Sequence, residues 1–324
     1  GPILSSNVRG SNVKYRSKVQ DASSLMAIAR SKAGMTLVEL LVAMACLAIV
    51  MGAVYQMFWG QSKIATAEQQ ILELQRNARV ASERLSFLIA NAGFGCSGSF
   101  PGNTLTGDDP DGGTVAINSV VSDIVNVSPG NGSDSVIFTL GFKKVAEVDG
   151  EHNQTASIPL DIIKGPPITT DSFKKYLTFY PNIDGNVVYT VSGVGTEYSF
   201  TKNIEFLGDD TSVYMVSPVR VKAEGGVLQL QNFSYVSSQF WAVAKNLERI
   251  QFQYTEDGNI WKDVPDDVDN VIGVKYFLLF KSGREDPGYR NTNNYTMAGV
   301  TLPKNNDAYH RYLTQETVWI RNAQ

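Results

Sequence analysis

The stretch Gly34-Met35-Thr36-Leu37-Val38-Glu39-Leu40-Leu41-Val42 decides how the chain is organised, because it opens a long apolar run and places one carboxylate inside it. Residues 40–59 carry no charge. About 20 such residues, each rising ~1.5 Å along a helix, cross a hydrocarbon layer ~30 Å thick. An ionised Glu39 there is costly unless a cation meets it. The stretch therefore predicts a membrane-spanning helix in which Glu39 has a specific partner.

The residues before this run set its orientation. Residues 26–34 are short and basic and end in small residues, and their cations, Arg30 and Lys32, predict a cytoplasmic N-terminus with the remainder of the chain outside. A cleavable secretory signal carries its small residues after the apolar run. Here they come before it, so a cut after Gly34 leaves the span attached.

Charge separates the first 34 residues from the rest. They hold six basic residues and one acidic residue, and the remaining 22 basic and 31 acidic residues give a net charge of −9. An acidic body repels phosphate backbones, so DNA capture is disfavoured unless a local basic strip overrides this. Residues 1–25 fit no part of the scheme; we expect Met26 to be the natural start and the upstream residues to be non-native.

The run Gly34 to Met44 resembles the class III signal of type IV prepilins and pseudopilins, which combines a basic leader, Gly, an apolar tract and Glu as fifth residue of the mature chain. The resemblance implies that a prepilin peptidase cuts between Gly34 and Met35 and N-methylates Met35, where Phe is usual. It also implies that Glu39 meets the positive N-terminus of Met35 in a neighbouring subunit. An ordinary single-span anchor, with Glu39 at the membrane interface, is the weaker alternative.

A second helical segment follows the span. Residues 61–92 contain no Gly or Pro, and apolar or small residues recur every three or four positions: Ile64, Ala67, Ile71, Leu74, Ala78, Ala81, Leu85 and Leu88. This spacing predicts an amphipathic helix, continuous with the span and ended by Asn91-Ala92-Gly93. These eight residues form one narrow apolar stripe, the seam, along the helix. We expect the seam to lie against the chain's own sheet rather than to form a coiled coil. The predicted exposed face contains Gln69, Gln70, Glu73, Arg76, Arg79, Glu83 and Arg84.

Beyond Gly93 the composition favours strands. β-rich runs occur at residues 134–140, 176–180, 213–216, 250–254, 271–280 and 317–320, and turn signals occur at Asp184-Gly185, Gly225-Gly226 and Asp257-Gly258. The alternation in residues 250–255 predicts a half-exposed strand, and the runs around Asp257-Gly258 should form a hairpin. After a short helical turn, the strand ending at Phe280 should be central. The fold class is therefore α+β, with a long helix packed on an antiparallel sheet.

The end of the chain carries a second resemblance. Residues 309–322 resemble the closing strand of PilW-type minor pilins, in which an aromatic and basic cluster precedes an apolar strand ending in Arg-Asn, and residues 79–94 are also similar to that family. Residues 97–240 match nothing in it, and we expect an insertion there. The sequence thus divides into a leader (1–34, with 26–34 the leader peptide), a transmembrane half-helix (35–59), an amphipathic half-helix (60–92) and a β-rich outer domain (93–324).

Catalytic and metal-binding patterns are weak. The two histidines, His152 and His310, have no Cys or second His at ligand spacing, and there is no G-x-S-x-G elbow. On one helix Cys46 and Cys96 would lie ~75 Å apart and cannot pair; a buried thiol is favoured for Cys96.

One loop has a composition that can hold calcium. It contains Asp108, Asp109 and Asp111, but a closing Glu and regularly spaced oxygen ligands are missing, so a solvated acidic loop is favoured. Arg311 and Tyr312 are interpreted as structural residues rather than ligand contacts. No cofactor and no catalytic residue are predicted.

The resemblance implies a PilW-like minor pilin with no enzymatic activity, inserted in the bacterial inner membrane and then extracted into a type IV pilus, a filament of cell motility. Its implied partners are the prepilin peptidase, the assembly platform, the major pilin and minor pilins of the PilV, PilX and FimU kinds, with an adhesin-like protein at the tip. A GspJ-like pseudopilin of type II secretion is the nearest alternative. A membrane-anchored periplasmic enzyme or sugar-binding module is an alternative of another class.

Overall fold

The computed structural model describes residues 36–93, 105–108, 114–129, 131–158, 160–161, 176–180, 188–194, 198–234 and 240–321. The following predictions lie outside these residues: the leader, the cleavage site at Gly34 and Met35, Cys96, Asp109, Asp111 and the turn at Asp184-Gly185. Contacts divide the chain into two units, residues 1–63 and 64–324, and each unit is described by itself.

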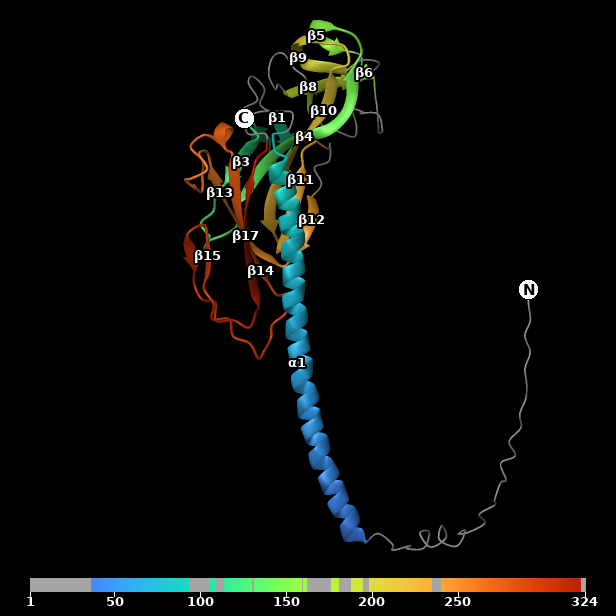
Figure 1. Cartoon of the computed structure of the whole chain (residues 1–324), viewed down its shortest axis with the longest axis vertical. Coiled ribbons are helices and arrows are strands. Elements are labelled where there is room, and N and C mark those ends of the chain that lie inside the picture. Colours follow the sequence, from blue (N-terminus) through green and yellow to red (C-terminus); the bar gives the residue numbers. More distant parts are fainter. Residues whose placement is uncertain are drawn as a thin grey trace, which may run out of the picture. The chain divides into compact units, whose positions relative to one another are not determined.

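One helix, α1 (Leu37–Ala90), has 54 residues and runs across the boundary between the two units (Figure 1). No proline interrupts it, as the sequence predicts. It ends where Gly93 adopts a positive φ of 76°, while the Asn91 amide donates to the Phe87 carbonyl (3.2 Å). The predicted continuous helix and its stop at Asn91-Ala92-Gly93 are both confirmed.

The remainder of the second unit is β-structure, and every strand pairing among the described residues is antiparallel. The α+β fold class is therefore confirmed. The strands are β1 Leu105–Asp108, β2 Thr114–Ile117, β3 Val121–Val125, β4 Ser135–Val148, β5 His152–Ile158, β6 Leu160–Asp161, β7 Tyr176–Tyr180, β8 Val188–Val194, β9 Tyr198–Leu207, β10 Ser212–Glu224, β11 Val227–Asn232, β12 Phe240–Lys245, β13 Leu247–Thr255, β14 Gly273–Lys281, β15 Tyr295–Met297, β16 Val300–Leu302 and β17 Arg311–Trp319.

The largest sheet is built on two long strands, β4 and β10, which pair along most of their length. The first half of β10 pairs with β7, and the second half pairs with β11. A predicted turn at Gly225-Gly226 joins β10 to β11, and both glycines have positive φ (57° and 76°), as a tight hairpin turn requires. β5, β8 and β9 lie at one end of this sheet (Figure 1). Together with β4, β7 and β10 they contribute to a separate apolar cluster that includes Phe179, Tyr189 and Phe200. Residues within 97–240 therefore supply a second core.

A smaller sheet contains β13, β14 and β17, with β14 central as predicted. The predicted helical turn is a 3-10 turn at Val268–Asn270. β13 and β14 pair as antiparallel neighbours, and 17 residues connect them. The Asp257-Gly258 turn lies within this connection and is closed only by an isolated bridge between Tyr254 and Lys262.

The prediction that β13 is half exposed is wrong. Gln251 and Thr255 are each only 1% exposed. Gln251 is buried against the segment that contains Gly132, and its Nε2 donates to the Gly132 carbonyl (3.1 Å). Alternation of polar and apolar residues could not reveal that a loop supplies this polar partner.

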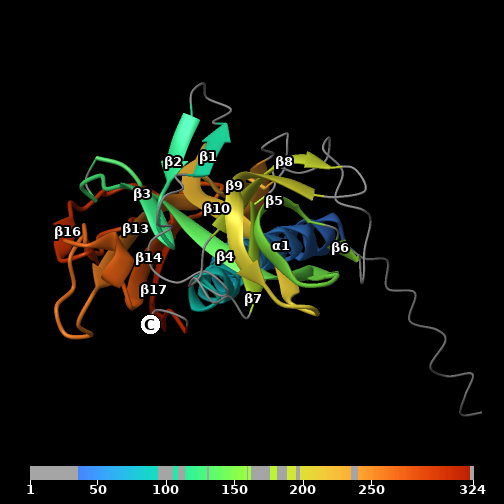
Figure 2. The same ribbon diagram turned by 90° about the horizontal axis from the view of Figure 1, so that it is seen from above.

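The C-terminal part of α1 lies between the two sheets (Figures 1 and 2). Its buried residues are Leu74, Ala78, Ala81, Leu85, Leu88 and Ile89, which confirms the predicted packing of this part of the seam. The earlier seam residues Ile64 and Ile71 are 61% and 37% exposed, so the prediction is wrong for them. The Ser86 hydroxyl lies 2.9 Å from the Tyr276 hydroxyl of β14, and Asn77 Nδ2 donates to the Lys245 carbonyl (3.2 Å). These bonds fix the helix against both sheets.

Candidate functional site

The start of α1 positions Glu39. Thr36 precedes the helix, and its backbone N–H and its hydroxyl both donate to Glu39 Oε2, at 2.9 and 3.0 Å. In return, the Glu39 amide donates to Thr36 Oγ1 (3.3 Å). This reciprocal arrangement is a capping box, which satisfies two N–H groups that the helix itself leaves unpaired. The Thr-x-x-Glu spacing carries this signal, and the sequence reasoning missed it.

The capping box leaves the charge of Glu39 without a cation. Among residues 36–63 the carboxylate accepts hydrogen bonds from Thr36 and forms no ion pair. The partial positive charge at a helix N-terminus favours a carboxylate in the first turn but amounts to about half an elementary charge. Glu39 is therefore held in place and can still pair with a cation from outside the described chain.

The helix that follows has no polar face. Its large side chains from Leu37 to Trp59 are all exposed within the described chain. In the part of the chain that the structure describes, α1 holds the one segment long and apolar enough to cross a membrane. A helix with apolar residues on all sides needs an apolar surrounding, either lipid or other helices.

Arg311, in the aromatic and basic cluster near the C-terminus, is held by ion pairs within the chain. The side chain of Arg311 is 2% exposed, and its Nε donates to Glu248 Oε2 (2.6 Å) while its Nη1 donates to Asp307 Oδ1 (2.7 Å). The hydrogen bond from Arg311 lowers the pKa of Asp307. These pairs agree with the structural interpretation of Arg311, because they tie β13 and the residues before β17 together.

Among the described residues, no group of three or more His, Cys, Asp or Glu side chains lies close enough together to hold a metal ion. His310 Nε2 lies 3.1 Å from Asp286 Oδ2, and its ring stacks on Tyr289. His152 lies on β5, with Nε2 2.7 Å from the Asp149 carbonyl. The preference for a solvated acidic loop over a calcium site stays a prediction, because Asp108 ends β1 and Asp109 and Asp111 lie outside the described residues.

A buried carboxylate fixes the loop that covers β13. Asp134 accepts hydrogen bonds from the amides of Val127 (2.8 Å) and Phe252 (2.7 Å). Burial nevertheless raises the pKa of Asp134 to about 6, because desolvation of the charged form outweighs these two bonds. The Asp134 carboxyl therefore binds its proton more tightly than an exposed aspartate does.

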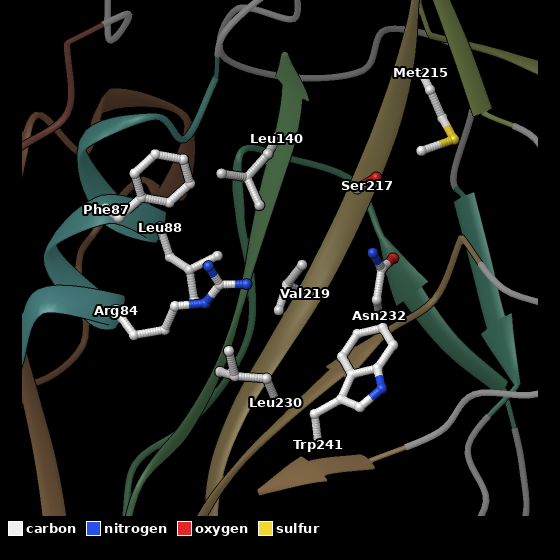
Figure 3. A pocket seen from close by; sticks show the side chains of 10 residues that line it. All are labelled: Arg84, Phe87, Leu88, Leu140, Met215, Ser217, Val219, Leu230, Asn232 and Trp241. Atoms are coloured by element: carbon white, nitrogen blue, oxygen red, sulfur yellow. The ribbon is translucent and has the colours of Figure 1, made fainter. Parts of the chain in front are cut away.

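A groove lies beside the C-terminal part of α1, with a volume of about 320 Å³. Figure 3 shows Leu140, Val219 and Leu230 between α1 and Trp241, which projects from β12. These strand residues share one face of the sheet, since Trp241 pairs directly with Leu230. The remaining lining residues are Arg84, Phe87, Leu88, Met215, Ser217 and Asn232. The sequence reasoning missed this groove, because strand register, not composition, brings its walls together.

Two family models match segments near the two ends of the chain. Residues 29–55 match the family described as Prokaryotic N-terminal methylation motif, and residues 230–322 match the family described as Type IV Pilus-assembly protein W. The predicted resemblance is therefore confirmed. The search of curated proteins found no match.

Two solved structures show a more distant likeness. A type IV-like pilin from Thermus thermophilus is 12% identical, with a TM-score of 0.39, and the match covers 78% of this chain and 98% of the other. A chain of the GspK-GspI-GspJ complex from the type 2 secretion system of enterotoxigenic Escherichia coli is 9% identical, with a TM-score of 0.29, and the match covers 76% and 99%. At these TM-scores neither structure bears on function.

Proposed function

We propose that this chain, which carries the prepilin-type methylation motif and a C-terminal match to the type IV pilus-assembly protein W family, is a minor pilin that primes assembly of a type IV pilus. The observation that carries the proposal is the motif at residues 29–55, placed directly on a helix whose first half is apolar on all sides. The helix anchors the subunit in the membrane, and its apolar surface is later covered by neighbouring helices.

Processing changes the charge at the start of the helix. A cut between Gly34 and Met35 leaves a positive amine on Met35, four residues before Glu39. The capping box with Thr36 holds the Glu39 carboxylate at the helix end before assembly. In the filament, the carboxylate pairs with the Met35 amine of a neighbouring subunit. Pairing neutralises two charges that would each be costly in an apolar core, and it fixes the axial position of the subunit.

The rest of the proposed scheme follows from the motif and the span. The basic leader stays in the cytoplasm and the β domain faces the periplasm, then the cell surface. The protein works by association and performs no bond chemistry. Its partners are the prepilin peptidase, the assembly platform, the major pilin and other minor pilins. In the filament the subunit lies near the pilus tip.

A GspJ-like pseudopilin would share the signal and the long helix. The match of residues 230–322 to the type IV pilus-assembly protein W family favours the pilus. Deletion of the gene decides between the two, because a secretion pseudopilin is needed for export and a minor pilin for surface pili.

The test is a deletion strain scored for surface pili by electron microscopy and complemented with wild-type, Gly34→Ala or Glu39→Ala chains. We expect few or no pili in the deletion strain, restoration by the wild type, an uncleaved precursor with Gly34→Ala, and cleavage without incorporation with Glu39→Ala. Normal piliation in the deletion strain would disprove the priming role. Normal processing of Gly34→Ala would place the cut elsewhere.

A further inference from the structure

The groove beside α1 is bordered by an exposed cation, Arg84, which has no ion-pair partner among the described residues. Figure 3 shows the Arg84 side chain reaching from α1 toward Val219 on the apolar floor. Arg84 forms no ion pair in the described part of the chain, and its one ring contact is with Phe87, at 5.9 Å. By contrast, Arg79 on the same helix pairs with Glu83 (2.9 Å). A guanidinium beside an apolar floor attracts a carboxylate more strongly than one fully surrounded by water.

The walls of the groove indicate a protein as the occupant rather than a small molecule. Phe87 and Trp241 remain 46% and 42% exposed although they border the groove. Val80 is also exposed, and it lies on the same helix flank as Arg84 and Phe87, at spacings of four and seven residues. The apolar surface therefore extends beyond a cavity of about 320 Å³. Exposed Trp, Phe and Arg side chains gathered at one place are typical of protein interfaces.

We propose that this groove receives an apolar side chain and an adjoining Asp or Glu from another pilin subunit. The apolar side chain packs between Phe87 and Trp241 on the floor formed by β4, β10 and β11, and the carboxylate pairs with Arg84. The choice of a pilin as the partner rests on the proposed function, whereas the chemistry of the partner segment rests on the groove. The interaction would give the β domain a lateral contact separate from that of Glu39.

The experiment uses the full-length chain in cells that assemble pili, with the photo-crosslinking residue p-benzoylphenylalanine at position 241. On illumination we expect a covalent adduct with another pilin, identified by mass spectrometry. Arg84→Glu should lower the adduct yield about tenfold, because it places like charges together. The matched control is Arg79→Glu, the same charge reversal on an exposed turn of the same helix outside the groove, and its yield should equal that of the wild type.

A charge-swap experiment tests whether Arg84 contacts the partner directly. In the Arg84→Glu chain, a Lys in place of the crosslinked partner's acidic residue should restore the adduct, which a merely structural defect would not allow. Adducts with lipid alone, no adduct in piliated cells, or equal yields from Arg84→Glu and Arg79→Glu would each overturn the proposal. A different result would overturn the minor-pilin proposal itself: cells would still assemble pili after deletion of the gene. If deletion abolishes pili while Arg84→Glu keeps wild-type adducts, only the groove proposal fails.

Discussion

The two halves of α1 belong to one helix but have opposite surroundings. From Leu37 to Trp59 the large apolar side chains are exposed on every side, whereas from Leu74 to Ile89 a single seam is buried by the chain's own sheets. The second half has its partners inside the chain, and this is the usual source of helix stability in a globular domain. The first half needs partners that the described part of the chain does not supply. Mutations should therefore affect folding in one half and assembly in the other.

The largest expected effect is the loss of stability when Leu85, which is fully buried in the seam, is shortened. Leu85→Ala should lower the free energy of unfolding of the β domain by about 2–5 kcal/mol, through lost apolar burial and the cavity left behind. Leu47→Ala, the same change in the exposed half, should leave the unfolding of that domain unchanged. Both are measured by thermal and denaturant unfolding of the full chain in detergent micelles. Equal losses from the two variants would break the distinction between the halves.

The second expected effect is on assembly and not on folding. Glu39→Gln keeps an oxygen that can accept from Thr36 but removes the charge. We expect the β domain to unfold as in the wild type, while incorporation into sheared pili falls about tenfold, the equivalent of about 1.4 kcal/mol. Quantitative immunoblotting of pili against whole cells measures this ratio. Unchanged incorporation would show that Glu39 acts as a cap only.

The comparison also shows what could be predicted from the sequence. The continuous helix, its stop at Gly93, the antiparallel sheets and the hairpin at Gly225-Gly226 follow from local patterns, because each depends on neighbouring residues. Burial of Gln251 could not be predicted, since its partner, the Gly132 carbonyl, lies over 100 residues away. Exposure of Ile64 and Ile71 was missed because periodicity shows which face is apolar but not how far the sheets extend along the helix.

The same distinction applies to the site. The residue pattern identified Glu39, whose chemistry is anomalous within its own segment. It did not identify the groove, because Arg84 and Trp241 meet only through strand register and the packing of α1. Arg84 is exposed as predicted, but the sequence pattern does not show that it borders the groove.

A third effect concerns pH and the β domain alone. The pKa of Asp134 is raised to about 6 in the fold, above its ordinary value of 3.8, so the folded state binds this proton more tightly than the unfolded state. The contribution of Asp134 to stability is therefore present at pH 4 and is lost as the pH rises through 6, by about 1–2 kcal/mol after allowing for solvent screening. Asp134→Asn should flatten this part of the profile, measured by denaturant unfolding between pH 4 and 8. The same slope in the variant would assign the dependence to other groups.

The smallest expected effect separates capping from charge at the start of α1. Thr36→Ala removes the hydroxyl that bonds with Glu39 but leaves the carboxylate charged, and loss of an N-cap costs about 0.5–2 kcal/mol of local helix stability. Frayed first turns should be visible as faster amide hydrogen exchange at residues 37–40 in micelles. The β domain should unfold as in the wild type, and incorporation into pili should fall less than for Glu39→Gln, because the carboxylate still pairs with a neighbouring amine. A larger loss of incorporation from Thr36→Ala than from Glu39→Gln would mean that placement of the carboxylate, rather than its charge, limits assembly.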